Sequence, residues 1–170
     1  MLTLSAQART TEVIAALEDA RRHGRDLTRA FEPVGEAAIN SIVANFEEGG
    51  RPEPWKPSRR AQREGGKTLI KDGILVGSFT SDAFPNRAEV WTNVPYAAIM
   101  HEGGTIPAHK VVAREGGALA IPVGDGVIFR KSANIPEAKI PARPFMMLQE
   151  EDWPVIEGHI MDEITGGLDD

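Results

Sequence analysis

The sequence has no cysteine and few aromatic residues, which make up 6% of its 170 residues. Without cysteine the chain has no disulfide framework, no thiolate nucleophile and no cysteine ligand for zinc or an iron–sulfur cluster. No apolar run approaches membrane-spanning length, and the first residues lack the apolar core of a signal peptide. We therefore expect a soluble protein of the cytoplasm with no membrane partner.

Basic residues are in the minority, and the net charge of −6 argues against a dedicated nucleic-acid-binding protein. The charges are unevenly distributed: residues 51–67 hold six basic and two acidic side chains, whereas residues 150–170 hold eight acidic and no basic ones. Either the two segments are solvated independently, or they form a complementary contact between neighbouring copies of the chain.

Helical periodicity marks three long segments. A first helix is predicted from about residue 5 to residue 23, and a last one from about residue 149 to residue 164. The second begins after Asp26 and ends at Gly49; its roughly twenty residues reach about 30 Å. Pro33 either kinks this helix or marks its start.

The stretch 93–106 predicts a rigid packing element in the middle of the chain. A short strand precedes it, Pro95 suits the first turn of a helix, and Gly103 with the next glycine ends that helix. Tyr96 and Ile99 share one face of the predicted helix. We predict that both belong to the core, together with Phe145.

Alternating and proline-rich segments complete the pattern. Residues 79–81 and 88–93 predict one hairpin, and residues 119–123 and 127–131 predict a clearer one. A short helix leading into a strand is expected at residues 68–79, and an extended edge segment at residues 140–145, whose prolines cannot donate to a sheet. Two extended loop arms are expected at residues 51–66 and 107–117. The sequence therefore predicts an α+β fold with a mostly antiparallel sheet packed against a long N-terminal helix, extended loop arms and a C-terminal helix.

Two motifs resemble ligand sites but are incomplete. His101-Glu102 matches the start of the zinc-protease helix, yet Thr105 occupies the position of the second histidine. Residues 65–68 match the end of a phosphate-binding loop, yet Ala61 stands where its first glycine is needed. We expect neither a metal nor a cofactor.

One catalytic alternative stays open at this stage. Asp125, Glu137 and Lys139 can be aligned with the acid-x-lysine pattern of metal-dependent nucleases, although the prolines at 136 and 141 fit poorly in a catalytic strand. A DNA-processing enzyme is therefore one alternative, and a monomeric toxin or host-binding module is another.

The expected interaction residues follow from the charge split. Trp55, in a proline-rich loop, is predicted to anchor a subunit interface. The basic residues of that interface are Arg59, Arg60 and Arg63, and the acidic ones are Glu150, Glu151 and Asp152. The arginines could also face DNA phosphate without sequence preference.

Four stretches, in order, resemble the phage virion morphogenesis family, the tail-completion or neck proteins of Mu-like phages. They are the polar loop 49–58, the segment 69–79, the segment 92–99 with the glycines and Thr105-Ile106 that follow, and the segment 140–145. The resemblance covers roughly residues 25–148. It implies a non-enzymatic virion subunit that forms a ring, sixfold, at the head–tail junction, where it completes or caps the tail. Its implied partners are further copies of itself, the neighbouring neck and tail proteins, and DNA in the lumen; assembly would take place in the host cytoplasm.

On this reading the chain is a single domain spanning residues 1–170. Residues 1–24 form the N-terminal helix, residues 25–148 the family core with its two arms, and residues 149–170 an acidic C-terminal helix and tail.

Overall fold

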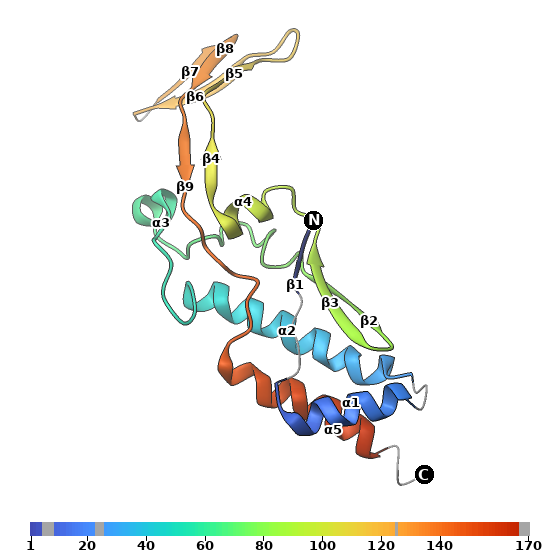
Figure 1. Ribbon diagram of the computed structural model, residues 1–170. Helices are drawn as coiled ribbons and strands as arrows, with labels where there is room; N and C mark the ends of the chain where they lie inside the picture. The colour runs from blue at the N-terminus through green and yellow to red at the C-terminus, as the bar shows by residue number, and fades with distance from the viewer. Residues whose placement is uncertain (5–8, 23–25, 125, 167–170) are drawn as a thin grey trace.

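The computed structural model describes residues 1–4, 9–22, 26–124 and 126–166. The fold is α+β with antiparallel sheets, as predicted. It has a body of helices and a small sheet, from which a β-structured arm projects (Figure 1). The helices are α1 (Thr11–Arg22), α2 (Thr28–Glu48), α3 (Arg59–Glu64), α4 (Ala97–Glu102), η1 (Glu150–Asp152) and α5 (Trp153–Gly166). The strands are β1 (Leu2–Leu4), β2 (Thr80–Phe84), β3 (Arg87–Thr92), β4 (Gly104–Ile106), β5 (His109–Val112), β6 (Leu119–Val123), β7 (Gly126–Arg130), β8 (Ser132–Ile135) and β9 (Ala138–Ile140).

The helical layer consists of α1, α2 and α5 (Figure 1). Helix α2 has 21 residues and includes Pro33 in its interior. It ends as predicted, because Gly49 takes a left-handed conformation (φ 76°) in which its N–H bonds back to the carbonyls of Asn45 and Phe46. Helix α5 packs against α2, and α1 packs against α5.

A three-stranded sheet of order β1–β3–β2 lies against α2. The close approach depends on Gly35, since a Cβ there would lie 2.7 Å from the Cβ of Ser81 in β2. The β2–β3 hairpin was predicted from the sequence. Strand β1 was not, and it pairs with β3 over Leu2–Leu4.

The body has two hydrophobic cores. The first gathers around Phe46, whose aromatic ring contacts those of Trp55, Phe79 and Phe145. The second lies between α1, the start of α2 and α5, and contains Phe31 and Ile160.

Two local predictions are corrected by the structure. Residues 51–66 are not wholly extended, because Ser58 caps α3 by accepting a hydrogen bond from the N–H of Ala61. Residues 68–79 form turns, not a helix.

The arm, residues 104–140, consists of three two-stranded antiparallel pairs: β4 with β9, β5 with β8, and β6 with β7. The β4–β9 pair projects from the body, and the other two pairs lie at the outer end of the arm (Figure 1). The hairpin formed by β6 and β7 was predicted. The stretch 107–117 was predicted as a loop, but its residues 109–112 form β5, which pairs with a strand twenty residues further along the chain.

Candidate subunit interfaces

Trp55 is not an exposed anchor. Its side chain is 8% exposed and meets Phe46 edge to face, with the ring centroids 5.8 Å apart. The backbone N–H of Trp55 donates to the carbonyl of Gly49 at 2.7 Å, which folds the proline-rich loop back onto the end of α2. The interface role predicted for Trp55 is therefore wrong, because a side chain that fills the core of its own subunit cannot anchor a neighbouring subunit.

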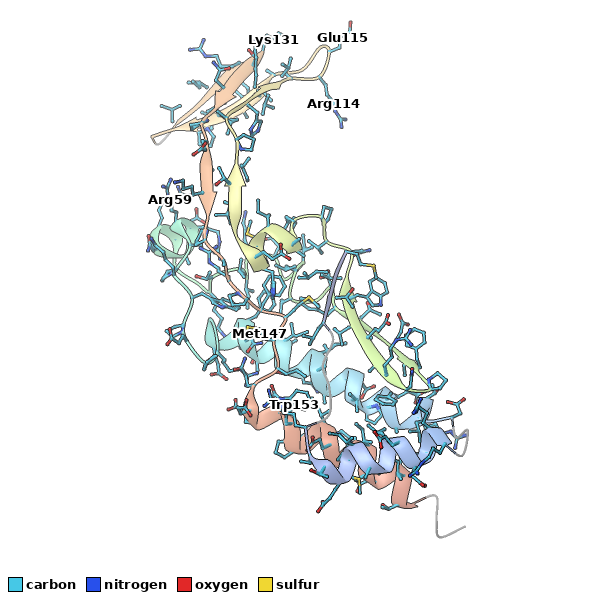
Figure 2. The ribbon with its side chains drawn as sticks, in the orientation of Figure 1. Arg59, Arg114, Glu115, Lys131, Met147 and Trp153 are labelled. Carbon is cyan, nitrogen blue, oxygen red and sulfur yellow. The ribbon has the colours of Figure 1, made fainter. Side chains whose placement is uncertain are left out.

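The three predicted arginines lie on or beside the exposed face of α3. Arg59 and Arg63 are exposed, and Arg63 pairs with its neighbour Glu64. Arg60 is partly used within the chain, because its guanidinium donates to the carbonyls of Lys67 and Ile70 at 2.5 and 2.8 Å. Figure 2 shows Arg59 close to the base of the arm.

The predicted acidic residues are engaged within one chain. Glu150 pairs with Arg9 at 2.6 Å, and Glu151 pairs with Arg51 at 2.7 Å. Asp152 accepts hydrogen bonds from the hydroxyl of Ser41 and, at 2.6 Å, from the backbone N–H of Gln149. The basic 51–67 segment thus meets the acidic segment inside the same copy through Arg51, and the contact between copies through residues 150–152 stays a prediction.

A buried polar network at this junction was missed by the sequence analysis. The guanidinium of Arg51 donates to the side-chain oxygen of Asn45 at 2.8 Å and to the hydroxyl of Ser41 at 2.9 Å. The Asn45 amide in turn donates to the carbonyls of Phe145 and Met147 at 2.9 and 2.8 Å. Ser41 and Asn45 lie one turn apart on the otherwise apolar face of α2, and these two polar residues are the feature of the sequence that could have indicated the network. The network fixes the returning segment 145–149 on α2.

The predicted core residues of the central stretch divide. Phe145 is fully buried, and Ile99 is half-buried. Tyr96 is 43% exposed, so its predicted place in the core is corrected. Helix α4 begins at Ala97, the residue after Tyr96, and the side chain of Ala97 faces the core instead.

His101 holds the base of the arm to the body. Its Nδ1 accepts hydrogen bonds from the backbone N–H groups of Phe145 and Met146 at 3.2 and 3.3 Å. Burial lowers the pKa of His101, although neighbouring Glu102 opposes this shift. The neutral ring is required for this role, since a protonated imidazole has no acceptor.

No cluster of three potential metal ligands occurs among the described residues. Lys139 lies in β9 opposite Thr105, and Glu137 precedes that strand. Asp125 of the nuclease-like pattern lies outside the described residues. Within the described ranges, no helix has the length and apolar character needed to cross a membrane.

The arm carries a second candidate surface. Strands β6 and β7 pair Ala120 with Phe129 and Pro122 with Val127, and directly opposed side chains point to the same face of a hairpin. All four are exposed; Phe129 is 69% exposed and Val127 is 54% exposed. We call this set the arm face.

A groove of about 940 Å³ opens in the body between the helical layer and the β2–β3 hairpin. Most of its lining is apolar and includes Ile14, Leu17, Phe31, Val34 and Ile160. Glu18 and Glu157 contribute carboxylates to the same lining, and Arg21 and Arg87 contribute guanidinium groups.

Comparison with known proteins identifies the family of this chain. The family model of the phage virion morphogenesis family matches residues 8–165. The "Mu-like prophage FluMu G protein 2" of Haemophilus influenzae is 32% identical over 154 residues, covering 91% of this chain and 85% of that protein. No solved structure matches. Because the family match extends over both the body and the arm, the chain belongs to the phage virion morphogenesis family.

Proposed function

We propose that this chain is a structural subunit that forms a homo-oligomeric ring at the head–tail junction of a tailed phage and completes or caps the tail. Membership of a virion morphogenesis family gives a role in building the phage particle. The related prophage protein extends this link to Mu-like elements. The ring, its sixfold symmetry and its place at the neck are the finer parts of the proposal.

The observation that carries the ring is the division of the chain into a compact body and a projecting arm (Figure 1). A surface on one side of a subunit that fits a different surface of its neighbour gives a heterologous contact, which closes into a ring when the rotation allows. Such a subunit acts by shape and contact, consistent with a family of structural proteins. Neighbouring neck and tail proteins, and DNA passing through the lumen, are the further partners of this proposal.

A morphological experiment tests the site of action. The gene is interrupted in an inducible prophage that encodes the chain, and the lysate is inspected by electron microscopy. We expect heads and tails that are complete but unjoined, or tails of abnormal length, with normal particles restored by the gene in trans. Normal infectious particles without the chain would contradict the proposal.

Oligomeric state is tested separately by light scattering of the purified protein, at low and high salt. A species several times 18.4 kDa is expected, with a mass that falls as salt rises. Assembly that needs a tail as template would appear instead as a ring in purified particles. A chain that is monomeric in solution and single-copy in particles would contradict the ring.

A further inference from the structure

The arm has no core of its own. Among residues 104–124 and 126–140 not one side chain is buried, although the segment contains six large hydrophobic residues that are exposed. These six are Val112, Val123, Val127, Ile128, Phe129 and Ile135. An isolated two-stranded hairpin is at best marginally stable in water. The arm therefore presents apolar surface whose burial would have to come from outside the arm.

Two of these exposed apolar residues lie together on the arm face, whereas Val123 and Ile128 point to the other face of the same hairpin. The arm face places Phe129 and Val127 side by side with Ala120 and Pro122, on neighbouring positions of one hairpin. Single exposed apolar residues are ordinary, but a contiguous apolar patch marks an interaction surface. Aromatic anchors such as Phe129 are enriched in protein–protein contacts.

The charges of the arm and of the helical layer are opposite. Residues 104–140 hold five basic and three acidic side chains, and residues 51–67 at the arm's base add six basic and two acidic ones. The helical layer is acidic: α2 holds one basic and four acidic residues, and η1 with α5 holds six acidic and no basic ones. The molecule is thus basic at the arm end and acidic at the helical end, which favours head-to-tail contact between copies.

We propose that the arm of one copy docks on the helical layer of a second copy of this chain, with the arm face over the apolar groove. The arm points away from the helical layer of its own copy (Figure 1), so that layer is reached only by the arm of another. Arg114 and Lys131 lie at the outer end of the arm, and Trp153 lies in the helical layer at the start of α5, well away from them (Figure 2). The groove supplies apolar complement for Phe129 and Val127. The carboxylates of Glu18 and Glu157 in its lining are balanced by Arg21 and Arg87, so the negative charge that faces the arm comes from the surrounding helices.

This inference rests on the ring proposed above and names the contact between its subunits. The ring and the docking of the arm can therefore be disproved separately. The first experiment replaces Phe129 with a photoreactive benzoylphenylalanine and irradiates the assembled protein, made from a mixture of isotope-labelled and unlabelled chains. We expect links between chains from position 129 to peptides of α1, α2 or α5. The same probe at Ile74, an exposed residue outside both surfaces, is the matched control and should give none of these links.

The second experiment uses substitutions on the arm face. Val127→Ser with Phe129→Ser should raise the dissociation constant of the assembly about tenfold or more, because two apolar side chains stay in water. Ile74→Ser is the control and should leave the constant unchanged. All three side chains are exposed in the single copy, so neither variant should alter the unfolding temperature of the monomer.

A charge exchange identifies the receiving surface. Lys110→Glu with Arg130→Glu reverses two positive charges at the arm end and should weaken assembly, and Glu18→Lys, at an exposed position of the groove lining, should do the same. A mixture of the two variants should assemble again, since each then offers the partner that the other needs.

Each outcome decides the matter. Assembly that tolerates the serine substitutions, or photochemical links confined to other arms or to a different protein, would overturn the docking inference and leave the ring in place. A chain that is monomeric in solution and in phage particles would overturn the ring as well.

Discussion

The body and the arm of this chain both form regular secondary structure, but only the body buries side chains. In the body, the aromatic rings of Phe46, Trp55 and Phe145 pack together and a buried polar network joins α2 to the returning segment. In the arm, the strands pair along their backbones but no described side chain is buried. Backbone pairing alone contributes little net stability, because its hydrogen bonds replace those that the unfolded chain makes with water. We therefore expect the body to be stable by itself, and we propose that the arm is the part that a partner covers.

The largest difference is expected at the centre of the body. Phe46→Ala removes a fully buried ring and should lower the free energy of unfolding by about 3–5 kcal/mol. Urea denaturation followed by circular dichroism measures this. A loss below about 1 kcal/mol would show that Phe46 is not the centre of the first core.

A smaller loss is expected in the polar network. Asn45→Ala removes the amide that donates to the carbonyls of Phe145 and Met147 and one of the acceptors of the Arg51 guanidinium, which should cost about 2 kcal/mol or more. Asn40→Ala, on the exposed side of the same helix, is the matched control and should change stability by less than about 0.5 kcal/mol. Equal effects at both positions would contradict the assigned role of the network.

Acid should loosen the junction between the two regions. Because burial lowers the pKa of His101, the unfolded chain binds the proton more readily than the folded chain does. The contribution of His101 to stability is therefore complete above the ordinary pKa of 6.5 and is lost as pH falls towards the lowered value in the folded state. The variant His101→Gln keeps an acceptor without titrating, so its stability should fall less than that of the wild type between about pH 7.5 and about pH 5.5. Parallel curves for the two proteins would contradict this account.

The smallest effect is expected on the arm. Phe129→Ala truncates an exposed side chain and should change the unfolding free energy of the monomer by less than about 0.5 kcal/mol. A loss comparable to that of Phe46→Ala would show that the arm has a core of its own, and the contrast between the regions would disappear.

Local patterns were enough to predict the regular elements. The apolar periodicity of α2 and its glycine end, and the alternating residues around Gly124, predicted the long helix and the β6–β7 hairpin. The pairing of β5 with β8 was out of reach, because neither His109–Val112 nor Ser132–Ile135 alternates clearly and their partners are distant. Antiparallel architecture and an extended arm at residues 107–117 were predictable, but the strand pairs that build the arm were not.

The interaction residues were harder to predict, because exposure depends on tertiary packing. A proline-rich basic loop suggested that Trp55 is exposed, yet the loop folds back and buries it against Phe46. Tyr96 was placed in the core by a spacing that is off by one residue, since Ala97 faces inwards. The uneven charge distribution did indicate a contact between the basic and acidic segments, but Arg51 makes part of this contact with Glu151 inside one copy.

Hydrogen exchange of the two regions, measured on the monomer and on the assembled form, tests the central claim most directly. Amides of α2 and β3 should be protected in both forms, because the body is stable alone. Amides of β5 to β8 should exchange fast in the monomer and become protected on assembly, when the arm face is covered. Arm amides that are as protected in the monomer as those of α2, or that stay unprotected in the assembly, would contradict the account.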